Sequence, residues 1–452
     1  MEKDLARELN SRHVQMLAIG GAIGTGLFLG AGTAIKQAGP SIMAAYLLAA
    51  LFTYWMLRAV GELVLSDTSK NSFIEFVRAY LGPKWEFVVG WTYWLCWESL
   101  AMTNLTASGI YVRFWFPAIP QWVTSLGALL LLLILNLASV GLFGKLESAF
   151  ASIKLIAIAA LILTGIIMLF GGQTVGGHQV ALQNLVDFGG FFPHKFIGML
   201  ACLPMVIFAY TGIEMVGLTS GETRNPEKNI PRAINSVGPM ISFCYIGALF
   251  VLMCIVPWNE ISASSSPFVQ VFSLMGVKAA AGIINFVVLT AALSSCNSAI
   301  FSTSRIIHSL AKSKQAPIFF GKTNKSRVPV NALLFSTVFL LIIVGLNFVL
   351  PAQIFTIISG VATVSFVFVW LTLMICHIKM RSFRGRKGIF PMPLYPLSSW
   401  LTIVFFLMVL VLLLFTADTR ISLFCAIIWF VALAIGCSLF YAERRSRKDD
   451  EN

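Results

Sequence analysis

A chain of 452 residues that is 58% hydrophobic and 11% charged differs sharply from soluble globular proteins, in which about a quarter of the residues are charged. The formal net charge of +13 would suit a nucleic-acid partner, but the basic residues occur in alternate loops, and we therefore expect no nucleic acid to bind. The composition excludes a soluble enzyme and favours a protein of the lipid bilayer.

Apolar runs of about 20 residues, the length that crosses a bilayer as a helix, recur along the chain. Helices are expected because each one satisfies its own backbone hydrogen bonds inside lipid. The sequence predicts an all-α polytopic membrane protein with about twelve spans, near 14–37, 40–65, 85–112, 121–143, 147–170, 196–219, 235–257, 279–304, 330–349, 354–376, 399–416 and 421–441. The loops are too short for an appended soluble domain, so one transmembrane domain over residues 1–452 is expected.

The distribution of Lys and Arg predicts the orientation of these spans. Basic residues concentrate in alternate loops and at both ends of the chain, as cytoplasmic segments do. The polar start of the chain lacks the short apolar core of a signal peptide, so the first span is expected to be retained. We therefore expect a multi-pass protein of the inner membrane with both termini in the cytoplasm. Few basic residues then face outward: Lys36, Arg113, Lys195, Lys278 and Arg420.

Two of the predicted spans carry glycines that would interrupt a helix. The first span contains GGAIGTGLFLGAG (Gly20 to Gly32) and the sixth contains FAYTGIEMVG (Phe208 to Gly217). Each glycine lowers helix stability by about 1 kcal/mol relative to alanine. Broken helices at corresponding positions of two halves indicate the central site of a transporter, whereas close helix packing is the alternative explanation for such glycines. We expect two inverted five-helix repeats, about 14–170 and 196–376, and peripheral helices at about 399–441.

A pair of broken helices is suited to binding a free amino acid. The exposed N–H groups of one half-helix attract a carboxylate, and the freed carbonyls of the other half accept from an ammonium group. This chemistry needs no reactive side chain, cofactor or metal. The expected substrate-binding residues are Ala22, Ile23, Gly24, Thr25 and Gly26 in the first span and Phe208, Ala209, Thr211 and Gly212 in the sixth.

Long segments of the chain are similar to one transporter family. They are RHVQMLAIGGAIGTGLFLGAG (Arg12 to Gly32), GWTYWLCW (Gly90 to Trp97), FAYTGIEMVGLTSGETRNPEKNIPRAINS (Phe208 to Ser236), INFVVLTAALSSCNSAIFSTSR (Ile284 to Arg305) and RVPV (Arg327 to Val330). In these segments the chain resembles the amino acid transporter family of the amino acid-polyamine-organocation superfamily. The resemblance implies the leucine-transporter fold, with the first and sixth helices broken.

The same resemblance suggests a substrate class. SPFVQVF (Ser266 to Phe272), MPLYPLSSW (Met392 to Trp400) and DTR (Asp418 to Arg420) look similar to members that carry glycine and D-isomers of alanine and serine. Relatives for threonine, proline or aromatic amino acids share much of this pattern. One residue departs from the family: Glu98 follows Cys-Trp in the third span, where members usually have an uncharged residue.

Charged residues inside the spans are costly unless they are paired or functional. Glu98 is expected either to contact an amine or hydroxyl of the substrate or to bond to a neighbouring helix. Arg58 and Glu62, four residues apart on one helix, are expected to form a structural ion pair. Glu214 follows the sixth-span break, and the resemblance implies that it belongs to the gating or proton-linked machinery. Glu222 lies at the start of the loop after the span and is expected to cap or gate the inner path.

Lys154 stands in the apolar sequence ASIKLIAIA of the fifth span. Snorkelling toward the cytoplasm is the alternative for such a residue, but its depth in the span favours a role in transport. In sodium-coupled carriers of this fold a cation lies between the first, fifth and eighth helices, and the resemblance implies that a lysine replaces it. Because desolvation disfavours the charged form of a buried amine, a proton on Lys154 would be exchangeable during transport.

The function that these features predict is proton-coupled import of small neutral amino acids by alternating access. The expected partners are the amino acid, protons and the lipid bilayer, and the protein is expected to be a monomer or a weak oligomer. A membrane enzyme is disfavoured because the sequence has no HExxH, P-loop or GxSxG motif. Transport of another amino acid, and exchange in place of symport, remain the alternatives.

Overall fold

The computed structural model describes residues 11–450, apart from 71, 139, 219–222, 277, 325, 327, 351–352 and 385–387. Helices make up almost all of the described secondary structure, as expected for a chain that must satisfy its backbone within lipid. The exception is a short hairpin of β1 (Thr174–Val175) and β2 (His178–Gln179). The prediction of an all-α polytopic protein is confirmed.

The first five predicted spans all correspond to helices. The first is interrupted and consists of α1 (Ser11–Ala22), the π-helix η1 (Gly26–Gly30) and α2 (Ala31–Ala38). A 3-10 turn, η2 (Gly39–Ser41), leads into the second span. The next four are α3 (Ile42–Leu65), α5 (Pro83–Val112), α6 (Gln121–Ala138) and α7 (Val140–Gly171).

The remaining predicted spans are helical as well, and the sixth is again interrupted. It consists of α8 (Lys195–Ala201), α9 (Leu203–Ala209) and α10 (Met215–Leu218). The others are α11 (Pro226–Ile255), α13 (Lys278–Lys312), α14 (Val330–Val349), α15 (Ile354–Arg384), α16 (Leu397–Leu412) and α17 (Ala417–Asp450). By length and hydropathy, 7 helical stretches of the described chain are able to cross a membrane, and shorter apolar helices accompany them.

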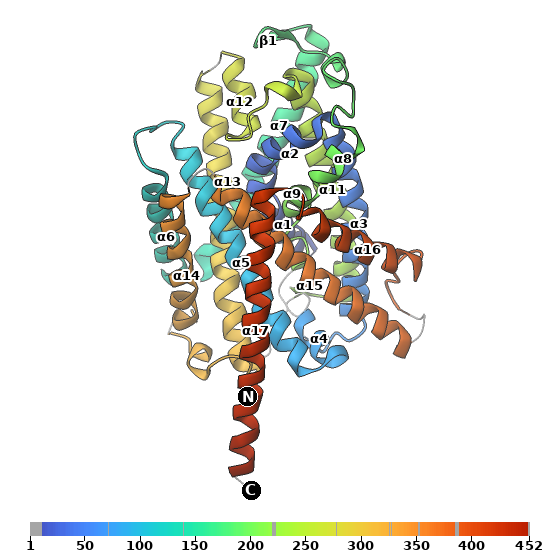
Figure 1. Cartoon of the computed structure of the whole chain (residues 1–452), viewed down its shortest axis with the longest axis vertical. Helices are drawn as coiled ribbons and strands as arrows, with labels where there is room; N and C mark the ends of the chain where they lie inside the picture. The colour runs from blue at the N-terminus through green and yellow to red at the C-terminus, as the bar shows by residue number, and fades with distance from the viewer. Residues whose placement is uncertain are drawn as a thin grey trace.

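Several short elements were predicted only as loops. These are α4 (Phe73–Leu81), α12 (Pro267–Leu274) and the 3-10 turns η3 (Leu182–Leu185), η5 (Trp258–Glu260) and η6 (Ile318–Gly321). In Figure 1, α12 and β1 lie at the upper end of the bundle and α4 at the lower end. Helices this short do not cross a bilayer, and they form caps on the two ends of the bundle.

The helices around the two interruptions form the centre of the bundle. α5 packs along both α13 and α15, while α3 packs against α11 and α15. The described residues of α17 are mostly exposed, and their apolar side chains, such as Phe424 and Ile428, face outward. In Figure 1, α17 runs along the outside of the bundle and extends past its lower end. This agrees with the prediction that the last helices are peripheral.

Candidate functional site

The first interruption separates α1 from η1 in the middle of the first span. The N–H of Ile23 still donates to the carbonyl of Ile19 at 2.8 Å, as it would in a continuous helix. Ile23 and Gly24 then form a bend, and the wider π-helical winding begins at Gly26. Because π-helical turns are rare and concentrate at functional sites, this segment is a strong candidate for ligand contact.

The second interruption lies between α9 and α10. Residues 210–214 form turns, and Gly212 has a φ of +93°. Backbone in this conformation is open to glycine and disfavoured for other residues, so Gly212 permits the break. The hydroxyl of Thr211 donates to the carbonyl of Phe208 at 2.7 Å, which satisfies part of the backbone that the helix leaves unpaired.

The two interruptions touch each other. A Cβ atom added to Gly26 would lie 2.6 Å from the Cα atom of Ala209, and one added to Gly212 would lie 3.1 Å from the carbonyl carbon of Gly21. The Tyr245 hydroxyl of α11 lies 2.9 Å from the carbonyl oxygen of Ala22 and 3.0 Å from that of Ala209. The predicted residues of the first and sixth spans are therefore brought together at one place.

Hydrogen bonds at this place limit how far the freed carbonyls can accept from the ammonium group of a substrate. The carbonyls of Ala22 and Ala209 share the Tyr245 hydroxyl, and the carbonyl of Phe208 accepts from Thr211. Each carbonyl oxygen has a second lone pair, but an ammonium group would have to share these oxygens with an existing donor. Ile23 is less committed, since its carbonyl oxygen lies 3.5 Å from the Ser295 hydroxyl.

Lys154 reaches the first interruption from α7. Its side chain is buried, and Nζ donates to the carbonyl of Gly20 at 2.9 Å and to the Ser295 hydroxyl at 3.1 Å. Ser295 belongs to α13, the eighth predicted span. The ammonium group therefore connects the first, fifth and eighth spans, and it contacts the last helical turn before the break.

Two buried polar atoms beside the first interruption have no hydrogen-bond partner among the described residues. They are Oγ1 of Thr25 and Oδ1 of Asn104, a residue of α5. A Cβ atom added to Gly24 would lie 3.0 Å from the Ser295 hydroxyl and 3.7 Å from Asn104 Oδ1, so these groups surround Gly24. Since buried polar atoms are nearly always paired, unpaired ones beside broken helices indicate a place for a polar ligand.

Glu98 lies on the same helix as Asn104, and its side chain is fully buried. Neither carboxylate oxygen has a hydrogen-bond partner in the described part of the chain. Among the described residues, no bond from Glu98 to a neighbouring helix is therefore present. One turn along α5, the Cys296 thiol of α13 donates to the carbonyl of Ala101 at 3.6 Å, so this face of α5 packs against α13.

Glu214 is bonded to the turns around the second interruption. One oxygen accepts from the Gly212 N–H at 3.1 Å and from the Trp370 indole of α15 at 3.3 Å, and the other from the Tyr93 hydroxyl of α5 at 3.3 Å. Its carboxylate therefore ties the break to two neighbouring helices. Glu222, the other predicted gating acid, lies outside the described residues.

The expected Arg58–Glu62 ion pair is wrong. Glu62 instead lies 2.6 Å from Nε of Arg381 and 2.9 Å from Nε2 of His377, both on α15, and it accepts from the Met392 N–H at 2.7 Å. The side chains of Glu62, His377 and Arg381 are all buried. Helical spacing makes an i, i+4 pair possible, but three donors from distant parts of the chain converge on this carboxylate and satisfy it better.

Arg58 makes other contacts. Its guanidinium donates to the carbonyl of Pro391 at 2.5 Å and to Oδ1 of Asn235 at 3.3 Å, and it lies over the Phe390 ring at 3.6 Å. Together, Arg58 and Glu62 fasten the segment before α16 to α3. This cluster lies toward the end of the bundle that we predicted to be cytoplasmic.

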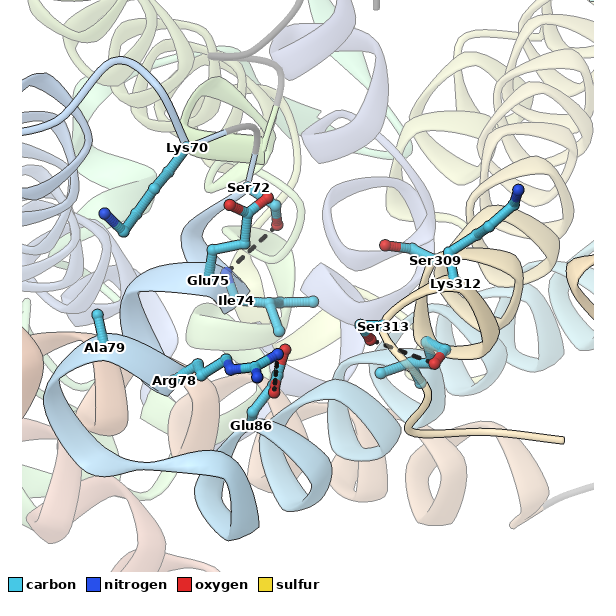
Figure 2. A pocket seen from close by; sticks show the side chains of 11 residues that line it. Lys70, Ser72, Ile74, Glu75, Arg78, Ala79, Glu86, Ser309, Lys312 and Ser313 are labelled. Carbon is cyan, nitrogen blue, oxygen red and sulfur yellow. Dashed lines mark hydrogen bonds and ion pairs between the residues drawn. The ribbon is translucent and has the colours of Figure 1, made fainter. Parts of the chain in front are cut away.

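A cavity of about 630 Å³ lies at the same end, between α4, the start of α5 and the end of α13. Figure 2 shows that Lys70 and Lys312 point away from each other, while Arg78 turns toward Glu86, 3.6 Å away. Glu75 adds a second acid to the lining. The basic groups do not converge and acids are interspersed, so this cavity has no centre for binding an anion.

Three residues of the central site were missed by the sequence analysis. Asn104, Tyr245 and Ser295 place polar groups at the first interruption although each stands in an apolar span. Polar residues within a span are themselves a signal of function or of helix contact. Which of them meet at the break depends on how α5, α11 and α13 pack around it.

Comparison with known proteins gives a consistent result. A family model described as amino acid permease matches residues 13–450. An "Amino-acid permease AapA" of Bacillus subtilis (strain 168) is 52% identical over 437 residues, which cover 96% of this chain and 95% of that protein. The "D-serine/D-alanine/glycine transporter" of Escherichia coli (strain K12) is 44% identical over 98% of this chain and 96% of its own length. A "Probable threonine/serine transporter YbxG" of B. subtilis is 39% identical over 98% and 97%.

Proposed function

Because this chain belongs to the amino acid permease family, we propose that it imports small neutral amino acids together with protons by alternating access. The observation that carries the proposal is the contact between two interrupted helices, with Gly26 against Ala209. Backbone groups freed at such a contact serve both charges of a zwitterion. Two inverted repeats, about 14–170 and 196–376, would rock around this contact.

The substrate carboxylate is assigned to the backbone N–H groups of Gly24, Thr25 and Gly26, at the start of the second half-helix. The ammonium group is assigned to the carbonyl of Ile23 and to Oδ1 of Asn104. Two features support this assignment: the Asn104 oxygen has no hydrogen-bond partner among the described residues, and it faces Gly24. A ligand ammonium would supply the donor that this buried oxygen needs.

A small neutral substrate is supported by the names of two relatives. One is named for D-serine, D-alanine and glycine, and another for threonine and serine. We therefore assign glycine, alanine and serine to this chain, D-isomers included. Glu98, whose buried oxygens have no partner in the described chain, is assigned to the hydroxyl or amine of the substrate and would adjust the choice among them.

Proton coupling is assigned to Lys154, which contacts the helical turn before the first break. In its charged form the ammonium group bonds Gly20 and Ser295 and holds three helices together. Loss of the proton would weaken both bonds and release α1. Glu214 and Glu222 are assigned to gating. The protein is assigned to the inner membrane, with both termini in the cytoplasm, as a monomer or a weak oligomer.

Counterflow in proteoliposomes tests the proposal. Vesicles preloaded with unlabelled glycine, alanine or serine should take up the same labelled amino acid faster than empty vesicles do. A panel of unlabelled L- and D-amino acids then ranks the substrates by competition. Gly127 lies in α6 with open space around it, so Gly127→Val serves as the control variant and should retain uptake. Absence of counterflow for the whole panel would contradict the proposed function.

A further inference from the structure

The connection between α13 and α14 is rich in basic residues. Residues 305–327 include no Asp or Glu, and their cationic residues are Arg305, Lys312, Lys314, Lys322, Lys325 and Arg327. Lys312, Lys314 and Lys322 are exposed. In Figure 1 this connection lies at the lower end of the bundle, the end that we assign to the cytoplasm. The bias of cytoplasmic loops toward Lys and Arg explains the basic residues but not the side chains between them.

Two large apolar side chains stand between these lysines. Ile318 is 85% exposed and Phe319 is 48% exposed, and both belong to the 3-10 turn η6. Burial of such side chains away from water is favourable, so two adjacent exposed ones indicate a contact with something apolar. The lysines on both sides indicate that this partner also carries negative charge.

The turn η6 is held beside the first turns of α14. The Phe320 ring packs against the Phe335 ring of α14 with centroids 5.1 Å apart, and the side-chain amide of Asn331 donates to the carbonyl of Phe319 at 3.0 Å. Leu334, in the same part of α14, is 46% exposed, as a residue that faces lipid would be. The exposed tip of η6 therefore lies where a spanning helix begins, at the boundary between headgroups and hydrocarbon.

The connection is also fastened to the bundle on its inner side. Gln315 follows Lys314 and is buried. Its Nε2 donates to the Glu86 carboxylate at 2.9 Å, and its backbone carbonyl accepts from the Trp91 indole at 3.1 Å. Both partners belong to α5, so the connection has a defined place relative to the spanning helices. In Figure 2 the ammonium group of Lys312 points away from the Glu86 carboxylate.

We infer that residues 312–322 form a binding surface for anionic phospholipids of the surrounding membrane. Ile318 and Phe319 enter the acyl region, and the lysines bind the phosphate groups. Apolar insertion and a basic cluster each bind a membrane weakly, and together they bind anionic lipid firmly. Lysine suits this place because its apolar stem lies along hydrocarbon while its ammonium group reaches the headgroups. This surface is separate from the contact between the two interruptions and does not depend on the transported substrate.

Thermal unfolding of the purified full-length protein in detergent, with added phospholipid, tests the inference. A ligand that binds the folded protein raises Tm. Phosphatidylglycerol, which is anionic, should raise Tm much more than the same concentration of phosphatidylcholine does. The triple variant Lys312→Gln, Lys314→Gln, Lys322→Gln should need roughly a hundredfold more phosphatidylglycerol for the same shift, because each lysine near an anionic surface contributes about a factor of five in affinity. Ile318→Ser should need about tenfold more, since it removes the inserted side chain.

A second triple variant provides the matched control. Lys84→Gln, Lys228→Gln, Lys379→Gln removes the same charge from exposed lysines at the same predicted end of the bundle. These lysines lie outside the 312–322 surface, so this variant should respond to phosphatidylglycerol as the wild type does. Sodium phosphate at the concentration of the lipid should leave Tm unchanged.

The outcomes decide between this surface and simpler explanations. Equal stabilisation by the two lipids would overturn the inference. Equal losses in the two triple variants would also overturn it, because binding would then follow net charge and not position. A wild-type response of Ile318→Ser would show that η6 does not enter lipid. An equal rise in Tm with sodium phosphate would overturn the assignment to lipid in favour of a free anion.

Discussion

The contact between Gly26 and Ala209 leads to the sharpest prediction about the bundle. In Gly26→Ala, the new Cβ atom would lie 2.6 Å from the Cα atom and 3.1 Å from the backbone nitrogen of Ala209. Carbon atoms in contact prefer about 3.5–4.0 Å, so the interruptions must separate by about 1 Å. The obstacle is backbone and cannot rotate away. Overpacking of this kind costs about 1–3 kcal/mol.

This cost falls on conformations in which the two interruptions touch. A bias of about 1–3 kcal/mol changes a conformational equilibrium by about 5- to 150-fold. We expect Gly26→Ala to lower the initial rate of glycine, alanine and serine uptake by roughly that factor, and Gly26→Val, with two further methyl groups, to abolish uptake. Both variants should insert normally, because the contact is between helices and not with lipid.

The assay is uptake into proteoliposomes, with protein yield and thermal unfolding in detergent as controls. Gly127→Ala and Gly127→Val are the matched variants, since an added Cβ at Gly127 has no neighbour within 4 Å. They should transport at the wild-type rate. Wild-type uptake by Gly26→Val would refute the reasoning, because it would show that the interruptions need not meet during transport.

Four further predictions concern charged side chains, of which Glu98, Lys154 and Glu62 are buried and Asp67 is partly exposed. Glu98→Val should change the ranking of competing amino acids more than it lowers protein yield, and an unchanged ranking would remove Glu98 from the substrate site. Lys154→Ala should bind substrate in dialysis yet lose accumulation against a gradient; full accumulation would exclude Lys154 from coupling. Glu62→Ala should lower the free energy of unfolding by about 3–5 kcal/mol, measured by denaturation in detergent, because it leaves buried donors unpaired. Asp67→Asn, which breaks a partly exposed ion pair with Lys70, should cost at most about 1 kcal/mol. Hydrogen bonds from Lys70 and Ser69 lower the pKa of Asp67 to about 2, so the contribution of this pair is present above about pH 4 and lost as the pH falls toward 2.

Much of the fold could be predicted because the bilayer restricts the choices. Apolar runs of spanning length must be helical, and dense glycines in two of them identified the two interruptions. The short elements were not predictable in the same way. α4 and α12 have 9 and 8 residues, and at that length an apolar pattern does not separate a helix from a loop.

The sequence named the glycines of the candidate site and two of the side chains that contact them, Lys154 and Glu214, but it did not name the polar side chains of the neighbouring helices. Gly24 and Gly26 could be named because glycine has a direct conformational meaning. Asn104 and Ser295 could not, since their position at the break depends on the packing of α5 and α13 around α1. The Arg58–Glu62 pair failed for the same reason: the partners of Glu62 stand on α15, more than three hundred residues away along the chain.

Accumulation of labelled glycine, alanine and serine in proteoliposomes is the most direct test of proton-coupled amino acid import. One set of vesicles carries a pH gradient, acidic outside, in sodium-free buffer, and the other carries an inward sodium gradient at equal pH. We predict accumulation above the external concentration with the pH gradient alone, and its loss when a protonophore collapses that gradient. Accumulation driven by sodium without a pH gradient, or simple equilibration under both gradients, would contradict the account.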